Sequence, residues 1–110
     1  MSVYTQESLD SLRFARNKLY EVAPYTLSSW SLADQEKYSE DLHRIVQQII
    51  SIESAMASGA NGKLQQYEGQ LKSAASNLEG YANNDSNLLH MVRSINSGLG
   101  AIDEIIGLIR

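Results

Sequence analysis

Apolar residues recur every three or four positions along most of the chain, which is the spacing of one face of an α-helix. The most regular series alternates steps of four and three near the C-terminus: Leu88, Val92, Ile95, Leu99, Ile102, Ile106 and Ile109. A second series is widened by Val46 and Ile50 and comprises Tyr38, Leu42, Ile45, Ile49, Ile52 and Met56. A stripe of that width predicts a helix that contacts two neighbours in a bundle.

Two further series complete the pattern. One comprises Leu64, Tyr67, Leu71, Ala74, Leu78 and Tyr81, and a weaker one comprises Leu12, Ala15, Leu19 and Val22, with Leu9 alongside and Phe14 off the line. The four series predict helices at about 5–23, 32–57, 63–81 and 86–109. Short links between four such helices predict an all-α, antiparallel four-helix bundle. We expect its core to bury Leu42, Ile49, Leu71, Ile95, Leu99 and Ile102.

Local signals set the predicted boundaries. Thr5 or Ser8 is a suitable cap for the first helix, and Pro24 ends that helix because proline lacks an N–H and restricts the residue before it. Ser31 is a suitable N-cap for the second helix, with Asp34 placed to favour its positive end. The stretch Ser-Gly-Ala-Asn-Gly at 58–62 predicts a break, because two glycines and an asparagine favour a turn.

The stretch Tyr-Ala-Asn-Asn-Asp-Ser-Asn at 81–87 allows two interpretations. The apolar spacing continues in phase across it, which favours one long helix with Asp85 as its only charged core position. The alternative fold is then a short N-terminal helix followed by a long two-helix hairpin. Against this, the polar residues would cost about 3 kcal/mol in a helix interior. We therefore predict a turn at 82–85, with Asp85 capping the last helix and accepting a hydrogen bond from Asn87 or Leu88.

Length and composition are those of one globular domain at 1–110. The chain has 110 residues, 43% of them hydrophobic, which is enough to bury a core without metal or disulfide support. It contains no cysteine, which excludes a disulfide scaffold, a thiolate metal site and a cysteine nucleophile.

The charge pattern argues against nucleic acid as a partner. Nine basic and thirteen acidic residues give a net charge of −4, and the basic residues are scattered. Binding to nucleic acid usually needs a basic stripe that follows the phosphates. The sequence also has no classical signal peptide and no apolar run of the roughly 18 residues that a membrane span requires. We expect a cytoplasmic protein, with export by a route without a classical signal as the alternative.

The two histidines are candidate metal ligands. Glu40 and His43 have the Glu-x-x-His spacing of helical di-iron sites, but Asn87 stands where the matching glutamate before His90 would be. Neither histidine lies on an apolar series, so we expect two partly exposed side chains and no metal. No nucleophile elbow and no phosphate-binding loop are present. We therefore assign no catalytic residue and no cofactor.

Four residues are candidates for partner contact. Tyr25 and Trp30 lie in a polar connector, where aromatic side chains either anchor a partner or fold back over the end of the bundle. Gly98 lies in the last helix, where glycine is costly, and Ala101 lies near it. They would allow close packing of another helix of the same chain or of another subunit.

Trp30 and the spacing Tyr81-x-x-x-Asp85 resemble motifs of type VII secretion substrates, which carry a Trp-x-Gly turn and a C-terminal Tyr-x-x-x-acidic motif. The resemblance implies an exported helical hairpin. The chain departs from that pattern at Leu32, which stands in place of the glycine, and in the additional helix before Trp30.

These patterns predict a non-enzymatic helical protein that acts by binding another protein or by self-association, as a homo-oligomer. A small accessory, immunity or inhibitor protein of a microbe or phage fits the size and composition. The alternatives are the exported hairpin protein and a small-molecule binder that uses a bundle cavity.

Overall fold

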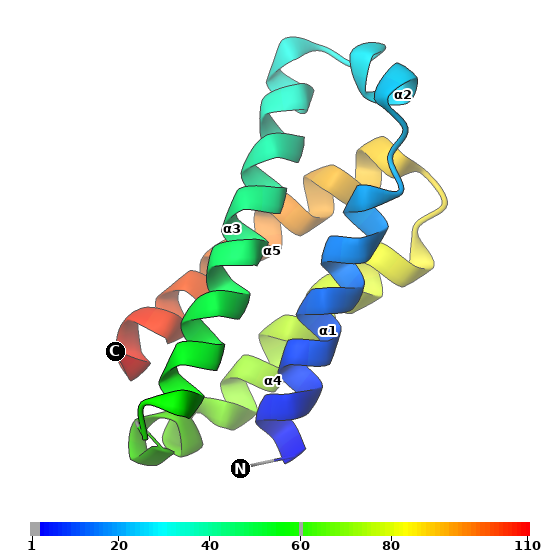
Figure 1. Cartoon of the computed structure of the whole chain (residues 1–110). Coiled ribbons are helices and arrows are strands. Elements are labelled where there is room, and N and C mark those ends of the chain that lie inside the picture. The colour runs from blue at the N-terminus through cyan, green and yellow to red at the C-terminus, as the bar shows by residue number, and fades with distance from the viewer. Residues whose placement is uncertain (1–2, 60) are drawn as a thin grey trace.

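The computed structural model describes residues 3–59 and 61–110, and these residues form helices with no strand. The helices are α1 (Val3–Tyr20), α2 (Pro24–Ser28), α3 (Leu32–Ala57), α4 (Asn61–Asn84) and α5 (Leu88–Ile109). Figure 1 shows α1 and α3 side by side in opposite directions, with α4 and α5 as a second antiparallel pair behind them. The prediction of an all-α four-helix bundle is confirmed for the four long helices.

Helices that follow each other in sequence are not always the ones that pack together most closely. α4 packs mainly against α1 and α5, and only slightly against α3, which precedes it. α3 packs mainly against α5. The two antiparallel pairs therefore meet through the contacts of α1 with α4 and of α3 with α5 (Figure 1).

The connector between α1 and α3 contains an additional short helix. α1 begins at Val3 and ends at Tyr20, so Thr5 and Ser8 are buried inside it and neither is its cap. Pro24 opens α2 at the first helical position, where its missing N–H costs nothing. The N-cap prediction for α3 is confirmed, because Ser31 Oγ accepts a hydrogen bond from the Asp34 N–H at 3.2 Å.

The predicted break after α3 is present. Ser58 caps the helix, and Gly59 follows with a φ of 77°, a left-handed conformation that glycine adopts at low cost. Residue 60 of the predicted 58–62 stretch lies outside the described residues. α4 begins at Asn61, two residues before the predicted start.

The chain reverses between α4 and α5, as predicted, but three residues later. α4 continues to Asn84, and the break spans 85–87. The alternative of one long helix is wrong: it would be about 68 Å long at 1.5 Å per residue, whereas the longest extent of the molecule is 45 Å.

The predicted cap of α5 is wrong. Asn87 is the N-cap, because its side-chain oxygen accepts a hydrogen bond from the His90 N–H at 2.9 Å. The hydrogen bond expected at Asp85 is nevertheless present, since Asp85 Oδ1 accepts from the Asn87 N–H at 3.1 Å. Asp85 therefore stabilises the turn before α5, and Asn87 is the N-cap of the helix.

Five of the six residues predicted for the core are buried. Ile49, Leu71, Ile95, Leu99 and Ile102 are buried as expected. Leu42 is only partly buried at the edge of the core, because α3 turns the neighbouring Asp41 inward instead. At the rim, Tyr81 and Leu88 remain 39% and 36% exposed.

Candidate functional site

The outward face of α4 consists of small and uncharged residues. Opposite the buried Leu64, Leu71 and Leu78, a line of small residues follows helical spacing: Gly62, Gly69, Ser73, Ser76 and Gly80. Uncharged amides flank the line, and all of these are exposed: Gln65, Gln66, Asn77, Asn83 and Asn84. Lys72 lies at the edge toward α1, where it forms an ion pair with Glu7 at 2.8 Å.

The glycines within this face have no packing partner in the described chain. A Cβ added at Gly69 would meet nothing within 4 Å, and one at Gly80 would meet only the Asn84 side chain at 3.9 Å. Glycine in a helix interior costs about 0.5–1 kcal/mol relative to alanine. Gly98 on α5 is different, because an added Cβ would lie 2.6 Å from Leu78 Cδ2. Close helix packing thus accounts for Gly98 but not for Gly69 or Gly80.

Two shallow hollows lie along the α4 face and share Ser76 and Asn77. One, of about 500 Å³, is lined by Tyr4, Gly69, Lys72, Ser73, Ser76 and Asn77. The other, of about 390 Å³, is lined by Ser76, Asn77, Gly80, Tyr81, Asn84, Asp85, His90 and Ser94. The shared residues make them one groove, which we call the α4 groove.

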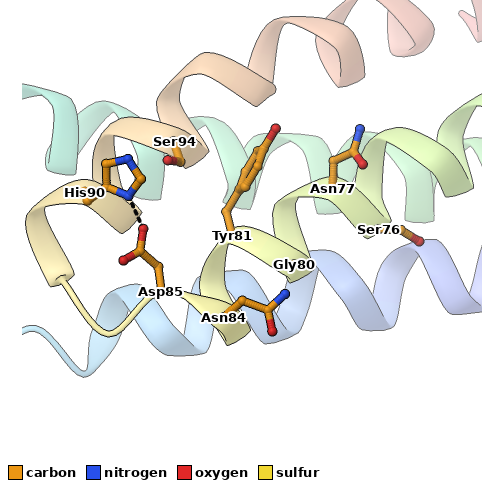
Figure 2. A pocket seen from close by; sticks show the side chains of 8 residues that line it. All are labelled: Ser76, Asn77, Gly80, Tyr81, Asn84, Asp85, His90 and Ser94. Atoms are coloured by element: carbon orange, nitrogen blue, oxygen red, sulfur yellow. Dashed lines mark hydrogen bonds and ion pairs between the residues drawn. The ribbon is translucent and has the colours of Figure 1, made fainter.

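At its end near α5, the α4 groove contains an ion pair. Figure 2 shows His90 Nδ1 paired with the Asp85 carboxylate, with Tyr81 rising from α4 beside them. The hydrogen bond from His90, assisted by the Asn87 N–H, lowers the pKa of Asp85. Asp85 and His90 are joined to each other, so the rest of this hollow presents mainly hydroxyl and amide groups (Figure 2). In the other hollow Lys72 is paired with Glu7.

A second polar region lies inside the bundle, between α3 and α5. Asp34, Asp41 and Gln48 are spaced seven residues apart on α3 and are 6%, 0% and 1% exposed. We call these residues and their α5 partners the α3–α5 seam. A spacing of seven places all three on the same side of the helix, facing α5.

Each residue of the seam has its own partner on α5. Asp34 accepts hydrogen bonds from Arg93 Nε and Nη2 at 3.0 and 2.9 Å. Asp41 Oδ1 accepts from Asn96 Nδ2 at 2.8 Å. Gln48 Nε2 donates to the Leu99 carbonyl at 3.1 Å and to Asp103 Oδ1 at 2.8 Å.

The two aspartates of the seam differ in their electrostatics. The hydrogen bonds from Arg93, helped by Ser31, lower the pKa of Asp34, although burial opposes them. Burial raises the pKa of Asp41 to about 7, and the hydrogen bond from Asn96 offsets only part of that effect. A guanidinium neutralises the first carboxylate, whereas an amide cannot neutralise the second.

The predicted aromatic contacts have separate environments. Tyr25 on α2 is 80% exposed. Trp30 is half-buried and packs against the core, and its carbonyl accepts a hydrogen bond from Gln35 Nε2 at 2.9 Å. Trp30 therefore covers the end of the bundle, while Tyr25 is free to contact solvent or a partner. Partner contact by either residue stays a prediction.

The two small residues predicted on α5 are also separated. Gly98 faces α4, where Leu78 and Tyr81 pack against it. Ala101 is exposed, so no helix of the described chain packs closely over it. Their contact with another subunit stays a prediction as well.

The histidines lie apart from one another in the fold. His43 is exposed on α3, and His90 is 70% exposed and paired with Asp85. Among residues 3–59 and 61–110, no three His, Cys, Asp or Glu side chains gather closely enough to hold a metal ion.

Sequence reasoning missed both the α4 groove and the α3–α5 seam. The groove had a visible signal, because glycine and serine repeat at helical spacing opposite the apolar series. The seam also had one, the polar repeat at 34, 41 and 48. Its burial could not be predicted, since it depends on partners about 50 to 60 residues away in sequence.

Comparison of the chain with protein-family models, curated proteins and solved structures found no match. None of the helices in the described part of the chain is both long enough and apolar enough to cross a membrane.

Proposed function

We propose that this chain is a non-enzymatic helical protein that binds another protein through the α4 groove. The observation that carries the proposal is the pair of glycines Gly69 and Gly80 inside the outward face of α4. Among the described residues, an added Cβ would meet nothing within 4 Å at Gly69 and only the Asn84 side chain at Gly80. A partner that packs closely against the α4 backbone would require small residues at these two positions. Packing within the described chain does not require them.

The chemistry of the groove supports recognition of a protein surface. Tyrosine, serine, glycine and asparagine dominate its lining, and these residues are enriched in binding loops of antibodies for physical reasons. Tyrosine supplies a large, rigid contact area at low entropy cost. Serine and asparagine supply hydrogen bonds that adapt to a partner. Tyr4 and Tyr81 lie in the two hollows on either side of Ser76.

The absence of charge along the α4 line also fits a contact surface. Charged residues are depleted at the centre of protein interfaces, because their desolvation is costly. The exposed side of α5 offers a contrast, since it carries Arg93 and Glu104 beside Ser97. That side therefore supplies a matched control for experiments on α4.

A photo-crosslinking amino acid at Asn77, which both hollows share, tests the proposal. We expect a specific covalent adduct with a protein partner in extracts of the source cells, identified by mass spectrometry. The same amino acid at the exposed Ser97 of α5 should give little adduct. Ser76→Lys should abolish the Asn77 adduct because it places a charge in the middle of the groove, while Ser97→Lys should leave it unchanged.

Two results would contradict the proposal. Equal adduct yields at Asn77 and Ser97 would show non-specific contact, and survival of the Asn77 adduct in Ser76→Lys would place the contact elsewhere. An adduct with a second copy of the chain, together with a dimer in sedimentation velocity, would identify the partner as the protein itself.

A further inference from the structure

Asp41 is a fully buried carboxyl with one oxygen left without a partner. Its exposed fraction is 0%, and Oδ1 accepts the hydrogen bond from Asn96. Oδ2 is buried and accepts no hydrogen bond from the described residues. A buried carboxylate in this setting is costly, because the ionised form loses water and gains neither a cation nor a second donor.

The charged groups near Asp41 do not replace that missing partner. On its own helix, Glu40 opposes ionisation of Asp41, while Arg44 and Lys37 favour it. Arg44 is held by Glu40 at 2.8 Å and by Asp103 of α5. The titratable imidazole of His43 lies two residues away and is exposed.

Among the described residues, no cation of α5 or α1 bonds to Asp41, and Arg16 of α1 is bonded to Asn17 Oδ1 at 3.3 Å. On α5, Arg93 is engaged by Asp34. On α1, Arg13 pairs with Glu53 at 3.1 Å and Lys18 pairs with Glu21 at 3.4 Å. Asp41 therefore meets α5 through the neutral amide of Asn96, which suits a protonated carboxyl as well as an ionised one.

The surrounding seam is suited to local opening. Gln48, one heptad along, has a buried Oε1 that also accepts no hydrogen bond from the described residues. α3 packs mainly against α5, less against α1 and only slightly against α4. Water can reach Asp41 Oδ2 only if α3 and α5 separate around residue 41, because the side chain is fully covered in the closed bundle.

We propose that Asp41 is a proton-sensitive latch, which holds α3 against α5 when its carboxyl is protonated and lets the two helices separate locally when it ionises. The burial of the side chain, its unpartnered oxygen and its neutral contact with Asn96 supply the geometry of the latch. The raised pKa of about 7 places the transition near neutral pH.

The sign of the effect follows from linkage. The unfolded chain ionises Asp41 near the ordinary value of 3.8, whereas the folded chain retains the proton to about 7. Stability from this group is therefore complete below about pH 4 and is lost as the pH rises to about 7. Across that window the unfolding equilibrium constant should rise by up to about tenfold per pH unit.

Spin labels on α3 and α5 test the latch directly. The chain has no cysteine, so His43→Cys and Ser97→Cys give two unique labelling positions, both exposed. Replacing His43 also removes the nearby imidazole from the titration. We expect a narrow distance distribution at pH 5 and a broader, longer one at pH 8. Asp41→Asn, which cannot ionise, should keep the distribution narrow at both values.

Asp34→Asn is the matched control, because it removes an aspartate of the same seam that is paired with Arg93. It should leave the broadening between pH 5 and pH 8 in place. If Asp41→Asn fails to fold, Asp41→Leu replaces it, since an apolar side chain of similar size also cannot ionise. An unchanged distribution from pH 5 to pH 8 in the labelled chain, or equal broadening after either Asp41 substitution, would overturn the proposal.

Discussion

Asp34 and Asp41 occupy equivalent positions one heptad apart on α3, and both are buried against α5. Arg93 provides two hydrogen bonds and a positive charge to the first, whereas Asn96 provides one hydrogen bond and no charge to the second. The pKa of Asp34 is lowered in consequence, and that of Asp41 is raised to about 7. Burial alone therefore does not decide how a carboxyl affects stability; the side chain opposite it does.

The contrast predicts an optimum in the pH dependence of stability. Asp34 stabilises the fold above its ordinary pKa, and that contribution is lost as the pH falls through the lowered folded value. Asp41 acts in the opposite direction between about pH 4 and pH 7. The two aspartates together favour greatest stability in mildly acidic solution.

The largest expected change in stability comes from the apolar core next to the seam. Ile95 is fully buried on α5 beside Asn96 in sequence, and Ile95→Ala should destabilise the fold by about 2–5 kcal/mol through lost burial and a cavity. Urea denaturation at constant pH measures it. A decrease in the free energy of unfolding below about 1 kcal/mol would mean that the core around the seam is loosely packed. Asp34 and Asp41 would then not lie in the tightly packed surroundings on which their contrast depends.

The second effect concerns Asp41 itself. At pH 8, Asp41→Asn should stabilise the fold by about 1–3 kcal/mol, because it removes the cost of a buried ionised carboxyl, reduced by partial access of water. At pH 4 the same substitution should be close to neutral, since the carboxyl is then protonated. Urea denaturation at both values measures the change. Equal effects at pH 4 and pH 8 would contradict the prediction.

The third effect tests the partner of Asp41. Asn96→Ala removes the one hydrogen bond that α5 donates to this carboxyl, and should destabilise the fold by about 1–2 kcal/mol at pH 6. It should also shift the pH at which stability is lost upward, because the ionised form loses its donor. A series of denaturation curves from pH 4 to pH 9 measures both, and an unchanged midpoint would show that Asn96 does not influence Asp41.

The smallest expected change in stability is in the α4 groove and, unlike the changes in the seam, does not depend on pH. Gly69→Ala should stabilise the fold by about 0.5–1 kcal/mol at every pH, since the added Cβ meets nothing within 4 Å and alanine favours the helix. Gly98→Ala should destabilise instead, because Leu78 occupies the space. Thermal denaturation measures both signs. Destabilisation by Gly69→Ala would mean that the groove is packed against something in the isolated protein.

The sequence predicted features that depend on neighbouring residues. The four long helices, the cap at Ser31 and a chain reversal within 81–87 depend on local signals, and each is present, the reversal three residues later than predicted. The cap at 85–87 was assigned to the wrong residue, because Asp85 and Asn87 are both good caps and only the fold decides which one the helix uses. Leu42 was expected in the core because it is apolar, yet α3 buries Asp41 in its place.

The candidate sites were less accessible to prediction. The small residues of the α4 groove could be found from spacing alone, but their exposure required the knowledge that α1 and α5 cover the other side of the helix. The difference between Asp34 and Asp41 depends on Arg93 and Asn96, which no local pattern brings to α3. The residues predicted for the core are all apolar, whereas Asp34, Asp41 and Gln48 are also buried, between α3 and α5.

Titration of the aspartate side-chain carboxyls by ¹³C NMR tests the central claim most directly, since Asp34 and Asp41 are observed in one sample of the unmodified chain. We expect Asp41 to titrate near pH 7 and Asp34 below the ordinary value of 3.8. Titration of both carboxyls near pH 4 would contradict it, because the partner on α5 would then not control the charge of either aspartate.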